Sequence, residues 1–185
     1  VIIHCNKNRK SAEVLCKRLI EKCREVEVLQ ADLSNPDACR QLIKDASRGQ
    51  PISALINNAS LFVYDEITDF SVQTLQRHIA VNVAAPAILT SEFAKQFRAK
   101  NSGCVINILD SKLFGLNPDY FTYTLSKAAL QNFGILAAQA YAPELRVNAI
   151  APGITLPSGG QTDEEFKRSH NCLLYTSDAA DELSC

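Results

Sequence analysis

Residues 104–109 read Cys-Val-Ile-Asn-Ile-Leu, and Asp110 follows them. A short, almost continuous apolar run of this kind predicts a strand buried on both faces, as in a parallel sheet covered by helices. Asp110 would then stand at the carboxyl end of that strand, which is the edge where open α/β sheets bind their ligands. This stretch therefore predicts both the fold class and the part of the sheet where a site should lie.

Strands and helices alternate on both sides of this run. We expect further strands at 1–5, 25–31, 53–56 and 146–150, and helices at 11–23, 37–47, 71–99 and 123–141. Pro36 suits the first turn of its helix, whereas Pro86 should bend the long helix that contains it. Such alternation predicts βαβ units with right-handed crossovers, hence a Rossmann-like, doubly wound parallel sheet in one α/β domain over residues 1–171.

The composition excludes several classes of protein. The 185 residues are 46% hydrophobic with a net charge of −1, which fits one globular domain. We expect no nucleic-acid partner because no basic patch is present, and no membrane association because the apolar runs are too short. The seven cysteines lack zinc-site spacing, so we predict no metal and a cytoplasmic location with free thiols.

Tyr123 and Lys127 are the strongest candidates for chemistry. Positions four apart share one helix face, so the phenol and the ammonium can point into the same cleft. A nearby cation favours the phenolate, and we therefore expect Lys127 to lower the pKa of Tyr123. Such a pair suits proton transfer to or from a carbonyl, imine or alcohol, but the same spacing is also common on solvated helix faces.

Flanking motifs give the pair its context. Asn57-Asn58-Ala59-Ser60, Asn82 within Val81-Asn82-Val83, and the segment 146–153 (Arg-Val-Asn-Ala-Ile-Ala-Pro-Gly) occur in order around it. Together they resemble the short-chain dehydrogenase/reductase family over residues 1 to about 170. Asp110 stands where most members have serine, and Phe62 follows the Asn-Asn-Ala-Ser motif. Both features look like the pteridine reductases and the related dihydromonapterin and dihydrofolate reductases.

This resemblance implies a reaction and roles for its residues. Hydride would pass from NADPH to a C=N bond of a dihydropterin or dihydrofolate, and Tyr123 would donate the proton. Lys127 would hold the nicotinamide ribose, and Asn82 would carry a water of the proton relay. Asp110 could feed protons or accept the N–H groups of the pterin, or it could merely cap a turn. Phe62 would stack on the substrate, unless it is a core residue or Tyr64 takes that role.

The turn after the first strand bears on the cofactor. Asn6-Lys7-Asn8-Arg9-Lys10 contains three cations and no acid, which favours NADP(H) over NAD(H) because cations can bind the extra phosphate. A merely solvated basic turn is the alternative. The resemblance places further residues along the cofactor: Lys7, Asn8 and Arg9 at the phosphate, Asp32 and Leu33 at the adenine, Asn57, Ala59 and Ser60 toward the nicotinamide, and Pro152 and Gly153 on its far side.

The same resemblance implies that the sheet is incomplete. Family members carry a first strand and a glycine-rich turn ahead of the strand at 1–5, and a last strand after the Pro-Gly segment. Residues 172–185 resemble translated sequencing-adapter read-through, and we expect them to be a non-native tail. A catalytically inactive fragment is therefore one alternative. Another is a reductase of a carbonyl, such as a 3-oxoacyl thioester, a sugar or a steroid ketone. By family analogy we expect a homo-dimer or tetramer.

Overall fold

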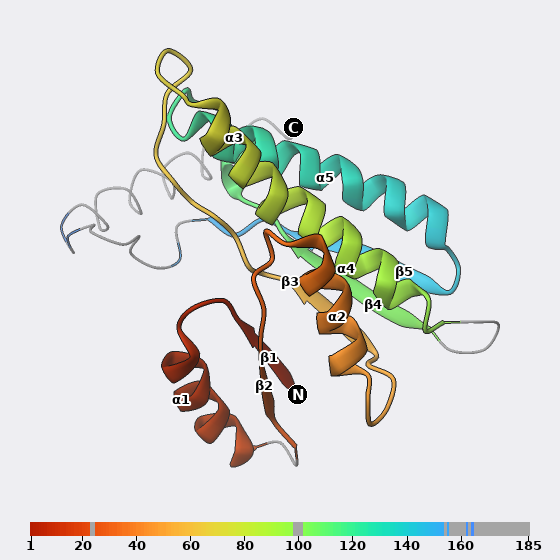
Figure 1. The fold of residues 1–185 in the computed structure, drawn as a ribbon. Coiled ribbons are helices and arrows are strands. Elements are labelled where there is room, and N and C mark those ends of the chain that lie inside the picture. The colour runs from red at the N-terminus through yellow and green to blue at the C-terminus, as the bar shows by residue number, and fades with distance from the viewer. Residues whose placement is uncertain (23–24, 98–101, 154, 156–161, 163, 165–185) are drawn as a thin grey trace, which may run out of the picture. The chain divides into compact units, whose positions relative to one another are not determined.

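A computed structural model of the protein describes residues 1–22, 25–97, 102–153, 155, 162 and 164. Two units are distinguished, Val1–Ile150 and Ala151–Cys185, and the fold below is that of the first. Its elements, labelled in Figure 1, are β1 (Ile2–Cys5), α1 (Arg9–Ile20), β2 (Glu27–Gln30), α2 (Pro36–Ala46), β3 (Ala54–Asn57), α3 (Val72–Ile79), a π-helical turn (Ala80–Ala84), α4 (Ala85–Ala94), β4 (Gly103–Ile108), a 3-10 turn (Ser111–Phe114), α5 (Phe121–Tyr141) and β5 (Leu145–Ile150). The expected tail at 172–185 lies outside the described residues.

All strand pairs are parallel, as the alternation of strands and helices predicts. They form two sheets, β1-β2 and β3-β4-β5, and in the described part of the chain no strand joins β1 to β3. In the second sheet Val105 of β4 is in register with Leu55 on one side and Val147 on the other. The prediction of an α/β fold with a parallel sheet is therefore confirmed, and β3 is left as an edge strand of the second sheet.

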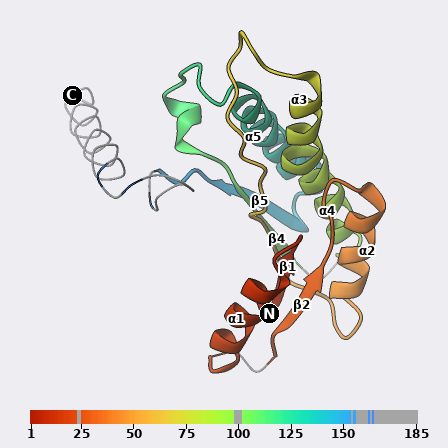
Figure 2. The same cartoon turned by 60° about the vertical axis from the view of Figure 1, so that its left-hand side comes forward.

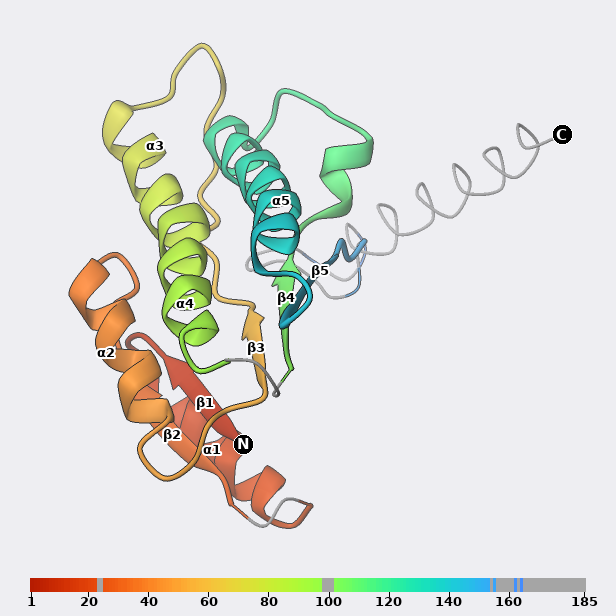
Figure 3. The same ribbon diagram turned by 90° about the vertical axis from the view of Figure 1, so that its right-hand side faces the viewer.

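One face of the β3-β4-β5 sheet is covered by α4 and α5, which run side by side along it (Figure 3). Val105 and Asn107 are buried on this face, whereas Cys104 and Ile106 on the other face are only half-buried. The sequence predicted burial on both faces of this strand. That prediction was wrong for the described residues, because α1 packs on β1 and β2 rather than on this sheet (Figure 2).

A single apolar core joins α2, α4 and the second sheet. Its buried members include Cys39, Leu42 and Ile43 of α2, Leu89 and Phe93 of α4, and Val105, Leu145 and Val147 of the strands. Side chains in such a core stabilise the fold by about 1.5–3 kcal/mol each when fully buried. Val105 of β4 and Ala137 of α5 both belong to this core, so the strand and the second half of the helix pack against each other.

The helix predicted at 71–99 is interrupted earlier than expected. A π-helical turn separates α3 from α4, and Pro86 follows it in the first turn of α4. Proline has no N–H to continue the α-helical ladder, so the preceding carbonyls bond in the wider π pattern. The interruption thus lies about one turn before the proline, and it turns the buried side chain of Asn82 inward.

Elsewhere the boundaries agree with the sequence to within a few residues. The loop predicted at 111–119 contains the 3-10 turn, and α5 begins at Phe121. Tyr120 precedes α5 with a φ of 53°, in the left-handed region that non-glycine residues rarely adopt. None of the helices in the described ranges combines the length and apolarity that crossing a bilayer requires.

Candidate active site

Tyr123 and Asp110 meet at the carboxyl edge of the second sheet. The Tyr123 hydroxyl, on the first turn of α5, donates a hydrogen bond of 2.7 Å to Oδ2 of Asp110, just beyond β4. The other carboxylate oxygen, Oδ1, accepts the N–H of Lys112 at 2.8 Å and so caps the 3-10 turn. The turn cap that the sequence offered as one alternative for Asp110 is therefore present, whereas its proton-feeding and pterin-binding roles stay predictions. The cap fixes the carboxylate, and the fixed carboxylate orients the phenol.

Lys127 lies one helical turn beyond Tyr123, and its side chain is also buried. Its Nζ donates a 2.8 Å hydrogen bond to the carbonyl of Ile108, the last residue of β4. The same nitrogen stands 5.6 Å from the centre of the Tyr123 ring, within the range of a cation–π contact. Phenol, ammonium and carboxylate thus form one cluster, as the spacing in the sequence predicts.

The acidity of Tyr123 differs from the expectation. Burial raises the pKa of the Tyr123 phenol, and the hydrogen bond to Asp110 and the charge of Asp110 raise this pKa further. Burial also lowers the pKa of Lys127, against the opposing effect of the Asp110 charge. The expected lowering of the tyrosine pKa is thus wrong for this structure, because burial and the adjacent Asp110 carboxylate raise it. The phenol is held in its protonated state, ready to donate.

Asn82 ties the π-helical turn to the segment that follows β3. Its Oδ1 accepts the N–H of Leu61 at 2.7 Å, and its Nδ2 donates to the carbonyl of Leu61 at 2.9 Å. Nδ2 also donates to Oγ of Ser126 at 2.9 Å, and the Ser60 hydroxyl donates to Oδ1 at 3.2 Å. Through these hydrogen bonds Asn82 connects the segment after β3 to α5. The relay role that the resemblance implied stays a prediction.

Substitution of Asn82 by alanine should destabilise the protein strongly. Both backbone groups of Leu61 would lose their partner while half-buried, and each unsatisfied buried group costs about 1–3 kcal/mol. We expect Asn82→Ala to lower the free energy of unfolding by about 2–4 kcal/mol in urea titrations. Asn132→Ala is the matched control, because among the described residues its exposed amide bonds only to its own helix. Equal losses of unfolding free energy in the two variants would contradict the stabilising role of Asn82.

Phe62 lies beside Tyr123, in a cluster of aromatic rings. Its ring contacts that of Tyr123 edge-on at 4.7 Å, and one of its faces stacks on Tyr120 at 4.2 Å between centroids. Tyr64 contacts Tyr120 edge-on at 5.1 Å. Phe62 remains 48% exposed, so it is not a core residue. The sequence analysis missed Tyr120, although the Asn117-Pro118 turn ahead of the helix could have drawn attention to it.

The residues predicted to bind a dinucleotide follow the carboxyl ends of the strands. Lys7, Asn8 and Arg9 come directly after β1 and are exposed. Asn8 caps α1 by accepting the Ser11 N–H at 3.1 Å, and Arg9 pairs with Glu13 at 2.9 Å on the surface. Both therefore have structural roles already. Lys7 has a weak electrostatic effect on Asp32 across the edge of the β1-β2 sheet.

The positions after β2 and β3 are partly engaged. Hydrogen bonds from the Ser34 N–H and hydroxyl lower the pKa of Asp32. Leu33 is buried in the core, so its side chain is not available for a ligand. Ala59 and Ser60 are exposed, whereas Asn57 is buried and donates to Asn107 at 2.8 Å. Pro152 and Gly153 belong to the second unit, which is described by itself.

Unmet hydrogen-bonding capacity remains near the ends of β3 and β4. In the described part of the chain, Oδ1 of Asn57 and Nδ2 of Asn107 are buried without a hydrogen-bond partner. Such groups are rare in folded proteins and call for an explanation, such as a bound polar group or water. Both side chains lie on the face that α4 and α5 cover, next to Thr90, so a buried water can satisfy them there. The residues present that fit a dinucleotide are the exposed cations of the turn after β1, whose charge suits a phosphate group.

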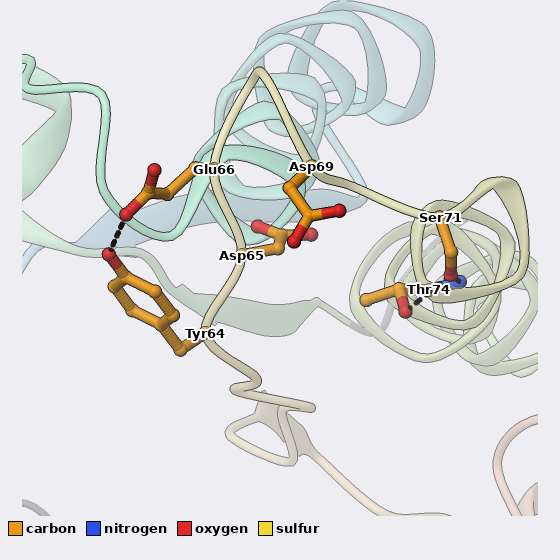
Figure 4. Close-up of a pocket in the computed structure, with 6 residues that line it drawn as sticks. All are labelled: Tyr64, Asp65, Glu66, Asp69, Ser71 and Thr74. Carbon is orange, nitrogen blue, oxygen red and sulfur yellow. Dashed lines mark hydrogen bonds between the residues drawn. The ribbon is translucent and has the colours of Figure 1, made fainter.

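A pocket of about 310 Å³ lies beside Tyr64, one of the rings of the aromatic cluster (Figure 4). Its lining residues are Tyr64, Asp65, Glu66, Asp69, Ser71 and Thr74. The Tyr64 hydroxyl donates to Glu66, and this bond raises the pKa of Tyr64 to about 12. Three carboxylates around one pocket repel phosphate groups. The pocket therefore does not suit a dinucleotide.

Comparison with known proteins gives a consistent result. A family described as short chain dehydrogenase matches residues 1–167. A solved structure from Brucella suis, the FolM alternative dihydrofolate reductase 1 in complex with NADP, is 44% identical, has a TM-score of 0.85, and is matched over 91% of this chain and 68% of that one. The corresponding protein from Brucella canis is 43% identical with a TM-score of 0.82, matched over 91% of this chain and 66% of its own.

Curated relatives are more distant. An NADPH-dependent aldehyde reductase of Arabidopsis thaliana is 33% identical over 71% of this chain and 50% of its own length. A dihydromonapterin reductase of an Enterobacter species is 29% identical over 76% of this chain and 59% of its own. The chain thus spans about half of the aldehyde reductase and somewhat more of the monapterin enzyme.

Proposed function

The chain belongs to the short-chain dehydrogenase family, and from this premise we propose that the protein is an NADPH-dependent reductase of a dihydropterin or dihydrofolate. The observation that carries the proposal is the 2.7 Å hydrogen bond from the Tyr123 hydroxyl to Asp110. A carboxylate at this position can accept adjacent N–H groups of a pterin in a bidentate way, which a serine hydroxyl cannot. The likeness to the FolM and dihydromonapterin reductases supports the same substrate class.

In the proposed reaction Tyr123 is the general acid. NADPH, when bound, supplies the hydride to the carbon of a C=N bond, and the Tyr123 hydroxyl gives its proton to the nitrogen. A raised pKa keeps that proton on Tyr123 until the nitrogen gains basicity. The Lys127 ammonium, 5.6 Å from the ring centre, stabilises the phenolate that remains. Asp110 holds the phenol in position, and a proton taken up from solvent and passed along the Asp110 carboxylate restores the phenol after the product leaves.

We also propose where the cofactor and substrate bind. Lys7, Asn8 and Arg9 would meet the extra phosphate of NADP(H), because they are exposed after β1 and the turn contains no acid. Asp32 and the backbone of Leu33 would lie at the adenine, with Asn57, Ala59 and Ser60 toward the nicotinamide. Phe62 would stack on the flat pterin, using the ring face that Tyr120 does not cover.

Steady-state assays on the full-length protein test this function. We expect NADPH oxidation with dihydrobiopterin or dihydrofolate, and a much lower rate with NADH.

The alternative that an observation supports is reduction of a carbonyl, since the aldehyde reductase is among the relatives and a Tyr-Lys pair can protonate a carbonyl oxygen equally well. NADPH oxidation with an aldehyde or a 3-oxoacyl thioester, and none with either pterin, would favour that alternative. A fluorescence titration of the 185-residue chain with NADPH tests whether it is an inactive fragment.

Assembly and location are further parts of the proposal. The helix α5 exposes Leu125, Ile135 and Leu136, and α3 exposes Val72. Apolar residues gathered on exposed helix faces favour association, so we propose a homo-dimer or tetramer. The described cysteines Cys5, Cys16, Cys39 and Cys104 are free thiols, which supports a reducing, cytoplasmic location. Sedimentation analysis of the full-length protein would test the assembly.

A further inference from the structure

A buried chain of polar groups connects the segment that carries Phe62 with the first turn of α5. His78 of α3 and Thr122 of α5 are both completely buried, and Nδ1 of His78 lies 2.8 Å from Oγ1 of Thr122. Nε2 of His78 accepts the N–H of Val63 at 3.3 Å. The Thr122 hydroxyl donates to Asp65, and the Thr122 N–H donates to Oδ1 of the same carboxylate at 3.0 Å. None of these groups takes part in the proposed proton transfer.

We propose that His78 and Thr122 are positioning residues for the substrate, which hold Phe62 against Tyr123 through this chain of hydrogen bonds. The proposal rests on the proposed pterin reductase function and names residues that set substrate affinity within it. Val63 directly follows Phe62, and Thr122 directly precedes Tyr123. These hydrogen bonds therefore hold Phe62 and Tyr123, the two rings that face the substrate, through the residues next to them in the sequence.

The direction of each hydrogen bond determines the state of His78. Because Nε2 accepts the Val63 N–H, it carries a lone pair, and the proton of the neutral ring must be on Nδ1. Nδ1–H then donates to Thr122, whose own proton goes to the carboxylate of Asp65. Every donor in the chain meets an acceptor only when His78 is neutral. A second proton on Nε2 would face the Val63 N–H, donor against donor, and break the link to the Phe62 segment.

Charged groups around His78 shift its pKa in both directions. Asp65 favours its charged form from the Phe62 segment, whereas Arg77 on its own helix opposes it. The Tyr123 ring of α5 packs edge-on at 6.2 Å. Burial has the largest effect and lowers the pKa of His78 below its ordinary value of 6.5. The linked form therefore binds fewer protons than an opened form with solvated histidine. The free-energy preference for the hydrogen-bonded form is therefore full above about pH 6.5, the ordinary pKa of a solvated histidine. This preference decreases as the pH falls below that value, because the opened form then binds a proton.

Variants at Thr122 test the positioning role. Thr122→Val keeps the shape but removes the hydroxyl, and we expect the KM for the dihydropterin to rise about tenfold, the loss that one buried hydrogen bond produces. The KM for NADPH should change little, and Thr122→Ser should restore substrate affinity. Thr124→Val is the matched control, because within the described part of the chain the Thr124 hydroxyl bonds only to the backbone of Tyr120 one turn earlier. A KM in Thr122→Val equal to that in Thr124→Val would overturn the proposal.

His78→Gln tests the protonation state separately from the packing. The glutamine amide can accept the Val63 N–H and donate to Thr122, but it does not titrate in this range. In the wild-type full-length protein kcat/KM should fall with decreasing pH once His78 in the linked form takes up a proton, which its lowered pKa places below pH 6.5. His78→Gln should keep the wild-type KM at neutral pH, and its kcat/KM should not show this decrease at low pH, the acid limb of the profile. A fall of kcat/KM in His78→Gln at the same pH and with the same steepness as in the wild type would overturn the proposal.

Hydrogen exchange gives a readout that does not depend on turnover. We expect the Val63 amide, corrected for the intrinsic pH dependence of exchange, to lose protection between pH 7 and pH 5.5 in the wild-type protein but not in His78→Gln. A Val63 amide whose protection is insensitive to pH would contradict the link even if no variant folds. If exchange behaves as expected but no pterin is reduced, the proposed function fails while the link stands.

Discussion

Tyr123→Phe is expected to lower kcat for dihydropterin reduction by about 10³-fold, within the range that a positioned general acid contributes. Phenylalanine keeps the ring and its edge-on contact with Phe62, but no proton donor remains at the 2.7 Å position beside Asp110. The affinity for NADPH should change little, since only the hydroxyl is removed. Single-turnover rates with saturating NADPH would measure the effect on the chemical step.

Tyr141→Phe provides the matched control for this prediction. Tyr141 lies at the other end of the same helix and packs against the apolar core. Removal of its hydroxyl should leave the rate of reduction within about twofold of wild type, as expected for a substitution outside the site. A Tyr123→Phe enzyme that retains a similar rate would show that another group supplies the proton.

Asp110→Ser should reduce kcat/KM for a dihydropterin by about 10²-fold, as expected when a charge-assisted bidentate contact is removed. Serine can still cap the 3-10 turn by accepting the Lys112 N–H, as Oδ1 of Asp110 does. The substitution therefore removes mainly the second oxygen, which faces Tyr123. Unfolding in urea should show that stability is largely kept.

The same variant separates the two candidate reactions. Reduction of an aldehyde or ketone needs a proton from Tyr123 but no bidentate acceptor for a pterin edge, so a carbonyl reductase should tolerate serine. Asp110→Asn is a useful companion, because it keeps the shape and the cap while removing the charge. Full activity of Asp110→Ser on dihydrobiopterin would remove the main support for the pterin assignment.

The relation between Tyr123 and Asp110 could be predicted because it depends on simple features. A buried strand that ends at Asp110 and a helix that begins near Tyr123 bring the two residues to one sheet edge. The order and type of nearly all elements followed from the same hydrophobic periodicity. The division into two sheets was not predicted from the sequence. It depends on which strands lie close enough in space to pair, and no local pattern gives that information.

Other features depend on packing that no local pattern encodes. The π-helical turn arises from the combined requirements of Pro86 and the buried Asn82 side chain, and only the proline was visible as a signal. The raised pKa of Tyr123 follows from burial, which a spacing of four residues does not reveal. The roles of His78 and Thr122 need a contact between residues 44 positions apart. Leu33 matched a cofactor position, but its side chain serves the core instead.

Isotope transfer in a single turnover tests the central claim most directly. Full-length protein would be mixed with NADPH carrying deuterium at the transferable position of the nicotinamide and with dihydrobiopterin, and the product analysed by mass spectrometry. We predict one deuterium on the carbon of the former C=N bond, formed rapidly by the wild type and about 10³-fold more slowly by Tyr123→Phe. Unlabelled pterin, together with deuterium transfer to a carbonyl substrate offered in parallel, would contradict the account.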